Sequence, residues 1–553
     1  MSRSTSDCGD LISCSWVQPA ISPEGGPRAS EASRLSCQNK SSKFLRSLRT
    51  LAWGAILAGV IPGINGISLA QSTPQGPSSQ PQKEVELPSK KGEFVHTFQV
   101  KKFGSGLDLV SLKASKVPLV TIVLVVKAGA MTETTDIRGL THLWEHMFFK
   151  GNQRIPNQEL FNKRIRQLGI VYNGDTSPEM VRYYFTLPSA FLDDGLQFMA
   201  DAISTPLLDQ KELERERIVV LDEYDRSAAR PGFDFNNLQR VLLYGNQEHQ
   251  RDPLGLRPII SQATREQLLR IKKEVFVPSN SALIVAGDFD QVELEKGVEK
   301  HFAMWKNPPE WKPIVPVPFP PFKENHQFVM TRPLVQNAYV ELTFVGPKAR
   351  MMPEDSFAVD VLSHLLALKS GKFYKKFVDS GLIFQGGLSY YTQSQAGEIN
   401  LYASTNPGLA ERVAVQLSDE VKEWLKADYF TEEQLADVRR SLSINHKRQI
   451  NQTSEYAKNL AFWWAVTGLD YYAKYQENLQ KVGLQQVRDF VQKWLVGTPK
   501  MVSTLVSPED AQKAGLVDNS QSLVERYLKH YQISSAQNQQ EKAPSPAPKG
   551  DNL

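Results

Sequence analysis

Cysteine is scarce in this sequence of 553 residues, and all of it lies near the N-terminus. The three cysteines are Cys8, Cys14 and Cys37. If the chain is cleaved after Ala70, the mature protein has no disulfide and no thiolate ligand. Any metal site would then have to use histidine and carboxylate side chains.

Long apolar runs are scarce as well. The main candidate, residues 51–61, follows a basic segment and precedes the small residues Ser68 and Ala70. This order is typical of a secretory signal peptide, and the apolar run is short for a membrane span. We therefore expect an exported, periplasmic protein. The alternative is an uncleaved signal anchor that tethers the protein to the membrane.

A concentrated charge of either sign is also missing. The chain has 64 Lys and Arg residues against 60 Asp and Glu residues, a net charge of +4. Residues 1–70 hold seven basic and four acidic residues, so the rest of the chain carries about +1. Because nucleic-acid binding needs a concentrated basic surface, we expect no nucleic-acid partner.

The composition of the remaining chain is sufficient for at least two domains. Hydrophobic residues make up 41% of the sequence. The β-branched run 120–126 predicts a buried strand, and the order strand, strand, helix recurs after a proline-rich segment. The predicted organisation is a leader and signal peptide (1–70), a disordered linker (71–92), a first domain (93–306), a proline-rich linker (307–322), a second domain (323–533) and a disordered tail (534–553).

The segment from Gly139 to Gly151 contains the pattern His-x-x-Glu-His, formed by His142, Glu145 and His146. Residues four apart on a helix share one face, so both imidazoles can bind one metal ion with Glu145 beside it. This is the inverzincin pattern. The alternative is a helix with solvated histidines.

A zinc site needs more than two ligands. The acid-rich segment 212–224 predicts a helix on which Glu216 and Glu223 are seven residues apart, which is two turns. Both carboxylates therefore lie on one face and are candidates for the further ligand. The alternative is a solvated acidic face.

The spacing of these residues resembles peptidase family M16, the pitrilysin/insulinase zinc peptidases, and in particular an M16B-like bacterial zinc-binding subunit. Glu223 follows His146 by seventy-seven residues, the spacing at which a distal glutamate completes the metal site in that family. Segments 172–176, 285–288 and 482–490 extend the resemblance over most of the chain. It implies an α+β fold of two similar α/β halves, the LuxS/MPP-like metallohydrolase fold, which form a clamshell.

The resemblance implies one Zn²⁺ per chain, bound by His142, His146 and Glu223, with Glu216 orienting a ligand from behind. Two imidazoles and a carboxylate leave one zinc position open for water, whose pKa the metal brings to about 7. Glu145 is then the general base that takes the proton of this water and returns it to the leaving amine. We expect a zinc-dependent endopeptidase that hydrolyses extended peptides or unfolded segments.

The segment around Asn173 and Tyr183 resembles the part of the family whose edge strand accepts substrate as an added β-strand. Such main-chain pairing selects extended peptides and makes little demand on their sequence. We therefore expect Asn173 and Tyr183 to belong to the substrate-binding region. The alternative for Asn173-Gly174 is a turn, which this dipeptide favours.

One departure from the family concerns its partners. Members that act alone carry an Arg and a Tyr in the second half, where this chain has Lys372 and Phe384. Lysine lacks the planar fork of arginine, and phenylalanine lacks the hydroxyl. Because family members often divide the labour, we expect the catalytic subunit of a heterodimer whose partner carries the Arg/Tyr pair. The alternative is an active homodimer.

The rival function is a non-catalytic M16-like scaffold or peptide-binding subunit. Such members typically lose metal ligands. All four motif residues, His142, Glu145, His146 and Glu223, are present here.

Overall fold

The computed structural model describes residues 98–525, apart from 115–116, 246, 248–251, 317 and 524. The predicted leader, signal peptide, linker (71–92) and tail (534–553) therefore lie outside the described residues. Within the described part, no helix combines the length and the apolar composition that crossing a membrane requires.

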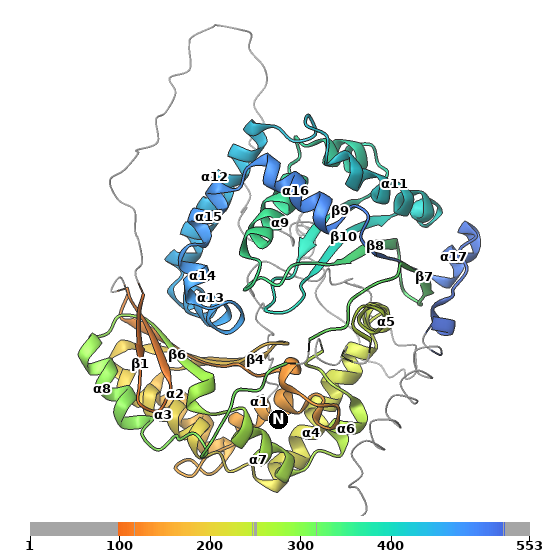
Figure 1. The fold of residues 1–553 in the computed structure, drawn as a ribbon. Helices are drawn as coiled ribbons and strands as arrows, with labels where there is room; N and C mark the ends of the chain where they lie inside the picture. The colour runs from red at the N-terminus through yellow and green to blue at the C-terminus, as the bar shows by residue number, and fades with distance from the viewer. Residues whose placement is uncertain are drawn as a thin grey trace, which may run out of the picture. The chain divides into compact units, whose positions relative to one another are not determined.

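Six strands form the first sheet, in the order β1-β2-β6-β3-β5-β4 (Figure 1). β2 and β6 run parallel, and the other neighbouring strands are antiparallel. The β-branched run predicted to be buried is the central strand β3, and β4 lies at the edge. The strands are β1 (Gln99–Lys102), β2 (Asp108–Lys113), β3 (Leu119–Val126), β4 (Val171–Thr176), β5 (Val181–Pro188) and β6 (Ser281–Gly287).

Five strands form the second sheet, in the order β7-β11-β8-β10-β9. β7 and β11 run parallel, and the other pairs are antiparallel. The second sheet thus repeats the order and directions of β2-β6-β3-β5-β4. The parallel pair β7-β11 corresponds to the parallel pair β2-β6 of the first sheet. Its strands are β7 (His326–Thr331), β8 (Ala338–Val345), β9 (Gln385–Tyr390), β10 (Glu398–Thr405) and β11 (Met501–Val506).

Helices surround both sheets (Figure 1). Those that precede the proline-rich segment are α1 (Leu140–Phe148), α2 (Gln158–Leu168), α3 (Leu192–Ser204), α4 (Gln210–Ala228), α5 (Gly232–Tyr244), α6 (Arg257–Ser261), α7 (Arg265–Glu274) and α8 (Gln291–His301). Those that follow it are α9 (Pro353–Leu366), α10 (Lys372–Tyr374), α11 (Ala410–Glu423), α12 (Glu432–Asn451), α13 (Thr453–Val466), α14 (Leu469–Ala473), α15 (Tyr475–Lys481), α16 (Leu484–Trp494) and α17 (Pro508–Ala514).

One helix of each half packs on the sheet of the other half. α13 packs on the first sheet against β3 and β6, and α5 packs on the second sheet against β11. The side chain of Gln239 in α5 donates a hydrogen bond to Ser503 Oγ in β11 over 2.9 Å. The two halves are therefore joined through both sheets as well as through the connecting chain.

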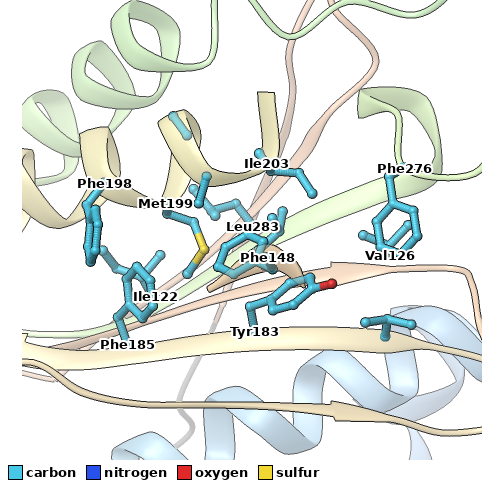
Figure 2. Packing of buried hydrophobic residues seen from close by; sticks show 14 of the residues in the cluster. Ile122, Val126, Phe148, Tyr183, Phe185, Phe198, Met199, Ile203, Phe276 and Leu283 are labelled. Carbon is cyan, nitrogen blue, oxygen red and sulfur yellow. The ribbon is translucent and has the colours of Figure 1, made fainter. Parts of the chain in front are cut away.

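The central strand β3 is buried on both of its faces, which explains its nearly continuous apolar sequence. Ile122 and Leu124 belong to the core under α1 and α3, whereas Val123 and Val125 face the core formed with α13. Figure 2 shows the first of these cores, in which Phe148 of α1 stacks on Tyr183 of β5 at a ring separation of 3.8 Å.

Several local expectations from the sequence are confirmed. The mixed α/β architecture has two similar halves, and the run 120–126 is a buried strand. Asn173-Gly174, for which a turn was the alternative, lies inside strand β4.

Candidate active site and metal centre

Helix α1 presents the two histidines because its other side is anchored in the core. Trp144 stacks on Phe276 at a ring separation of 4.0 Å, and its Nε1 donates to the carbonyl of Leu268 over 3.2 Å. His142 and His146 lie one turn apart on the remaining face, with ring centroids 4.9 Å apart. The helical spacing therefore puts both imidazoles on one face, and the long-range contacts of Trp144 orient that face away from the core.

The start of α1 is held by an upstream carboxylate. Gly139 has a left-handed backbone (φ 88°), and a Cβ there would lie 2.9 Å from the Cα of Gly255. Because glycine offers no capping side chain, the buried carboxylate of Glu133 accepts from Gly139 N and Thr141 N, each over 2.8 Å. It also accepts from Thr141 Oγ1 over 2.7 Å. Glu133 thus caps the helix from six residues upstream.

Helix α4 brings its carboxylates to the histidines. Asp209 caps this helix by accepting from the backbone N–H groups of Lys211 and Glu212. Leu213 and Val220 are buried, and Glu216 and Glu223 each follow one of them by three residues on the same side of the helix. The two glutamates are therefore two turns apart on a helix, as predicted, and this helix packs against α1.

Three side chains converge on one point. Glu223 Oε2 lies 3.5 Å from His146 Nε2 and 3.7 Å from His142 Nε2. One ligand atom from each residue lies within 4.8 Å of the others. Ligands about 2.1 Å from one tetrahedral zinc ion are roughly 3.4 Å apart, so these separations fit a shared ion.

Glu216 lies behind His146. Its Oε2 is 3.2 Å from His146 Nδ1, and its Oε1 accepts from Lys150 Nζ over 2.6 Å. Burial alone would raise the pKa of Glu216, but the hydrogen bonds from His146 and Lys150 outweigh burial and lower this pKa. An ionised Glu216 can fix the ring orientation of His146, as partners of metal-binding histidines commonly do.

Glu145 is buried beside these residues and faces the edge strand β4. Its Oε2 accepts from Thr176 Oγ1 over 2.8 Å. A Cβ at Gly174 would lie only 2.7 Å from Glu145 Oε1, so glycine allows the strand to approach the carboxylate. Burial raises the pKa of Glu145 to about 7, a value suited to a general base.

The histidines differ in their surroundings. Burial lowers the pKa of His142 to about 4, and its buried Nδ1 has no hydrogen-bond partner among the described residues. Burial also disfavours the charged form of His146, but hydrogen bonds to Glu216 and Glu223 dominate and raise its pKa to about 9. The carboxylates thus favour a positive charge at this position.

The two residues predicted for substrate binding occupy different environments. Asn173 lies on β4, which pairs with β5 and with no other strand of the described residues. Tyr183 is fully buried on β5 between β3 and β4, and its hydroxyl has no partner among the described residues. The side chain of Tyr183 therefore offers a peptide no exposed surface in this conformation and supports β4 from the core.

Sequence reasoning did not find Glu133, Lys150 or Thr176 as parts of this site. Each acts through a hydrogen bond or ion pair to a motif residue or to its helix. A single sequence carries no periodicity that would indicate such contacts between segments.

Comparison with known proteins identifies the class to which this fold and site belong. Residues 109–249 match the family Insulinase (Peptidase family M16), and residues 262–442 match the Peptidase M16 inactive domain. Together the two matches cover more than half of the chain. The chain belongs to peptidase family M16.

Curated relatives of this chain include bacterial proteins named as zinc proteases. The zinc protease PqqE of Helicobacter pylori is 27% identical over 402 residues, which are 71% of this chain and 85% of the relative. The uncharacterized zinc protease YmxG of Bacillus subtilis is 24% identical over 64% of this chain and 86% of its own.

Solved structures share the fold. A protease from Helicobacter pylori aligns with a TM-score of 0.69 and 21% identity, covering 75% of this chain and all of that one. The first half of the periplasmic protease PqqL from Escherichia coli aligns at 0.63 and 18%, covering 78% and 96%. Pitrilysin aligns at 0.65 and 18%, covering 77% of this chain and 46% of its own. The predicted fold class, two similar α/β halves of the pitrilysin-like clamshell type, is confirmed.

Proposed function

We propose that this chain is a zinc-dependent endopeptidase that cleaves extended peptides or unfolded segments. The observation that carries the proposal is the convergence of His142, His146 and Glu223 beside the buried carboxylate of Glu145. Membership of family M16 and relatives named as zinc proteases support the same assignment.

In this proposal His142, His146 and Glu223 hold one zinc ion per chain. The metal would supply a Lewis acid that polarises the scissile carbonyl and lowers the pKa of a water molecule. Glu145 takes the proton of the attacking water and delivers it to the leaving amine. Thr176 orients the Glu145 carboxylate, and Glu216 holds His146.

The substrate would bind along β4 as an added strand. β4 is the outermost strand of its sheet, and Gly174 and Thr176 lie on the face that meets Glu145. A peptide paired with this edge would pass the carboxylate in an extended form, since main-chain pairing requires an extended strand. Asn173 would contribute to this edge, with Tyr183 packed beneath it.

We also propose that the protein is exported to the periplasm and divides into domains at 93–306 and 323–533, with 307–322 as the linker. The signal-like sequence before residue 70 supports export. The solved PqqL of Escherichia coli is described as periplasmic.

Replacing Glu145 by Gln tests the catalytic assignment. We expect the variant and the wild type each to bind one zinc ion per chain, because no ligand is changed. Its peptide hydrolysis should fall by about 10²-fold or more, since the general base is lost. Zinc content by elemental analysis and turnover of an unstructured fluorogenic peptide are the two measurements.

Chelation separates this function from its rival. Zinc-free wild-type protein should lose hydrolysis and regain it when zinc is restored. A chain that binds peptides but contains no zinc and hydrolyses none would instead be a scaffold or peptide-binding subunit. Full turnover by the Glu145→Gln variant with zinc bound would remove Glu145 from the mechanism.

A further inference from the structure

The hairpin formed by β4 and β5 is held from both faces. Gly174 and Thr176 lie on the face that meets Glu145. Successive residues of a strand point to opposite faces, so Asp175 points away from α1. Its register partner across the hairpin is Arg182 on β5. Asp175, which lies between Gly174 and Thr176, therefore faces α13 on the other side of the sheet.

Arg182 connects this face to α13. Its side chain is 6% exposed, its Nε donates to Asp175 Oδ2 over 2.6 Å, and its Nη1 donates to the carbonyl of Lys458 over 2.8 Å. Lys458 lies in α13 and places its ammonium 4.8 Å from the ring centre of Tyr184. A planar guanidinium can satisfy a carboxylate and a carbonyl at once, which a lysine cannot do with the same geometry.

A second contact from the second half reaches the same hairpin. Glu179 in the turn between β4 and β5 accepts from the backbone N–H of Ser394 over 2.8 Å. Ser394 lies in the connection between β9 and β10 of the second sheet. The turn and the strand pair are thus both attached to the half that carries none of the candidate metal ligands.

We propose that α13 positions the edge strand β4 for catalysis, and that Arg182 is the positioning residue through which it acts. The proposal rests on the proposed peptidase function. It gives a role to a helix that lies outside both matched family ranges, 109–249 and 262–442. Through Arg182 and Asp175, the second half holds Gly174 and Thr176 against Glu145 and sets where a paired peptide lies.

The other end of α13 provides a matched control. Lys127 follows β3 and places its Nζ 4.4 Å from the ring centre of Trp464, which is also in α13. This contact joins a cationic side chain of the first sheet to the same helix, but β4 is not involved. If the substitutions acted only by loosening the packing of α13, Lys127→Met would have as strong an effect on β4 and on activity as the substitutions of Arg182.

The experiment compares Arg182→Lys, Arg182→Met and Lys127→Met in the full chain. Arg182→Lys keeps the charge and loses the fork, so it remains informative if Arg182→Met fails to fold. We expect both Arg182 variants to exchange the β4 amides about tenfold faster in hydrogen exchange followed by mass spectrometry. Their kcat should fall about tenfold or more, because a small misplacement of reacting groups is enough for such a loss. Zinc affinity, measured by chelator competition, should stay within about twofold of the wild type. Lys127→Met should leave β4 exchange and kcat unchanged.

Unchanged β4 exchange in both Arg182 variants would overturn the proposal. An equal effect of Lys127→Met would also overturn it, because general packing of α13 would then be the cause. A parallel loss of zinc affinity would assign the effect to collapse of the metal centre. If the wild-type chain lacks zinc-dependent hydrolysis, the proposed function fails, and the exchange measurement alone decides whether α13 braces β4.

Discussion

At the scale of single residues, a buried carboxyl in the second sheet has no part in the proposed chemistry but affects stability. Glu341 of β8 is 5% exposed, and burial raises its pKa to about 7. The charge of Glu398 acts in the same direction. The hydroxyl of Thr343 donates to Glu341 Oε1 over 3.3 Å. The neighbouring side chains of Tyr339, Gln239 and Thr343 oppose the shift of this pKa but do not cancel it.

The sign of the resulting pH dependence follows from proton binding. Between pH 4.5 and about 7, the folded protein keeps a proton on Glu341 that the unfolded chain has released. Stability therefore falls as pH rises through this window, and the full contribution is present only below it. A shift of this size corresponds to about 3 kcal/mol at most.

Replacing Glu341 by Gln should remove this dependence. The neutral amide resembles the protonated acid, so the variant should match the wild type near pH 4.5. At pH 8 it should be more stable, with a melting temperature higher by several degrees. Thermal melts at both pH values measure the difference. The same substitution at the exposed Glu411 of α11 is the control. An equal difference at both pH values would contradict the assignment to Glu341.

At the scale of elements, helix α1 depends on a cap that does not belong to it. The carboxylate of Glu133 accepts from two backbone N–H groups and one hydroxyl at the start of the helix. Burial raises the pKa of Glu133 to about 7, so its negative charge, which complements the helix dipole, is present mainly above that pH. Because both candidate ligand histidines are on α1, the cap and the metal centre are linked through one rigid segment.

Removing this cap should weaken both stability and metal binding. Glu133→Ala leaves buried donors unpaired, which costs about 1–3 kcal/mol. We expect a lower melting temperature and roughly tenfold weaker zinc binding by chelator competition. Removing groups that orient metal ligands typically lowers metal affinity by about tenfold or more. Glu159→Ala is the control, because Glu159 is in the first turn of α2, which Asn157 already caps. Unchanged zinc affinity in Glu133→Ala would show that the cap and the metal centre are independent.

The elements also show what the sequence could and could not predict. The helical period predicted that His142 and His146 share a face, and the two-turn spacing predicted the same for Glu216 and Glu223. Both patterns are local, so one helix is enough to realise each. The contact of Arg182 with α13 joins positions 276 residues apart. No local pattern encodes the contact between Arg182 and Lys458, which forms only when α13 of the second half packs on the first sheet.

At the scale of the whole molecule, the two halves are similar in topology but not in chemistry. The first half carries the candidate ligands, and the second half contacts β5 and the turn of the β4–β5 hairpin. Lys372 stands where the family resemblance expects an arginine that helps to hold substrate. Its Nζ donates to the carbonyl and the carboxylate of Asp428 over 2.7 and 2.9 Å. Phe384, at the position of the expected tyrosine, is 56% exposed and has no hydroxyl.

These two positions lead to a prediction about partners. We propose that an M16 partner supplies the arginine and tyrosine that this chain lacks. Mixing the chain with a relative that carries the pair should raise kcat/KM for an unstructured peptide by about tenfold or more, since each hydrogen bond to substrate contributes about 1 kcal/mol or more. A relative with the pair replaced by Ala and Phe is the matched control and should add nothing.

The same idea can be tested within one chain. Lys372→Arg combined with Phe384→Tyr should raise the activity of the isolated protein, because a forked cation and a hydroxyl return to the positions where the family places them. The double variant should also depend less on the added relative. The proposal is wrong if the unmodified chain works at full rate as a homodimer and neither the relative nor the double substitution increases hydrolysis. In that case the second half already completes the site, and Lys372 and Phe384 are variation within the family that requires no partner subunit.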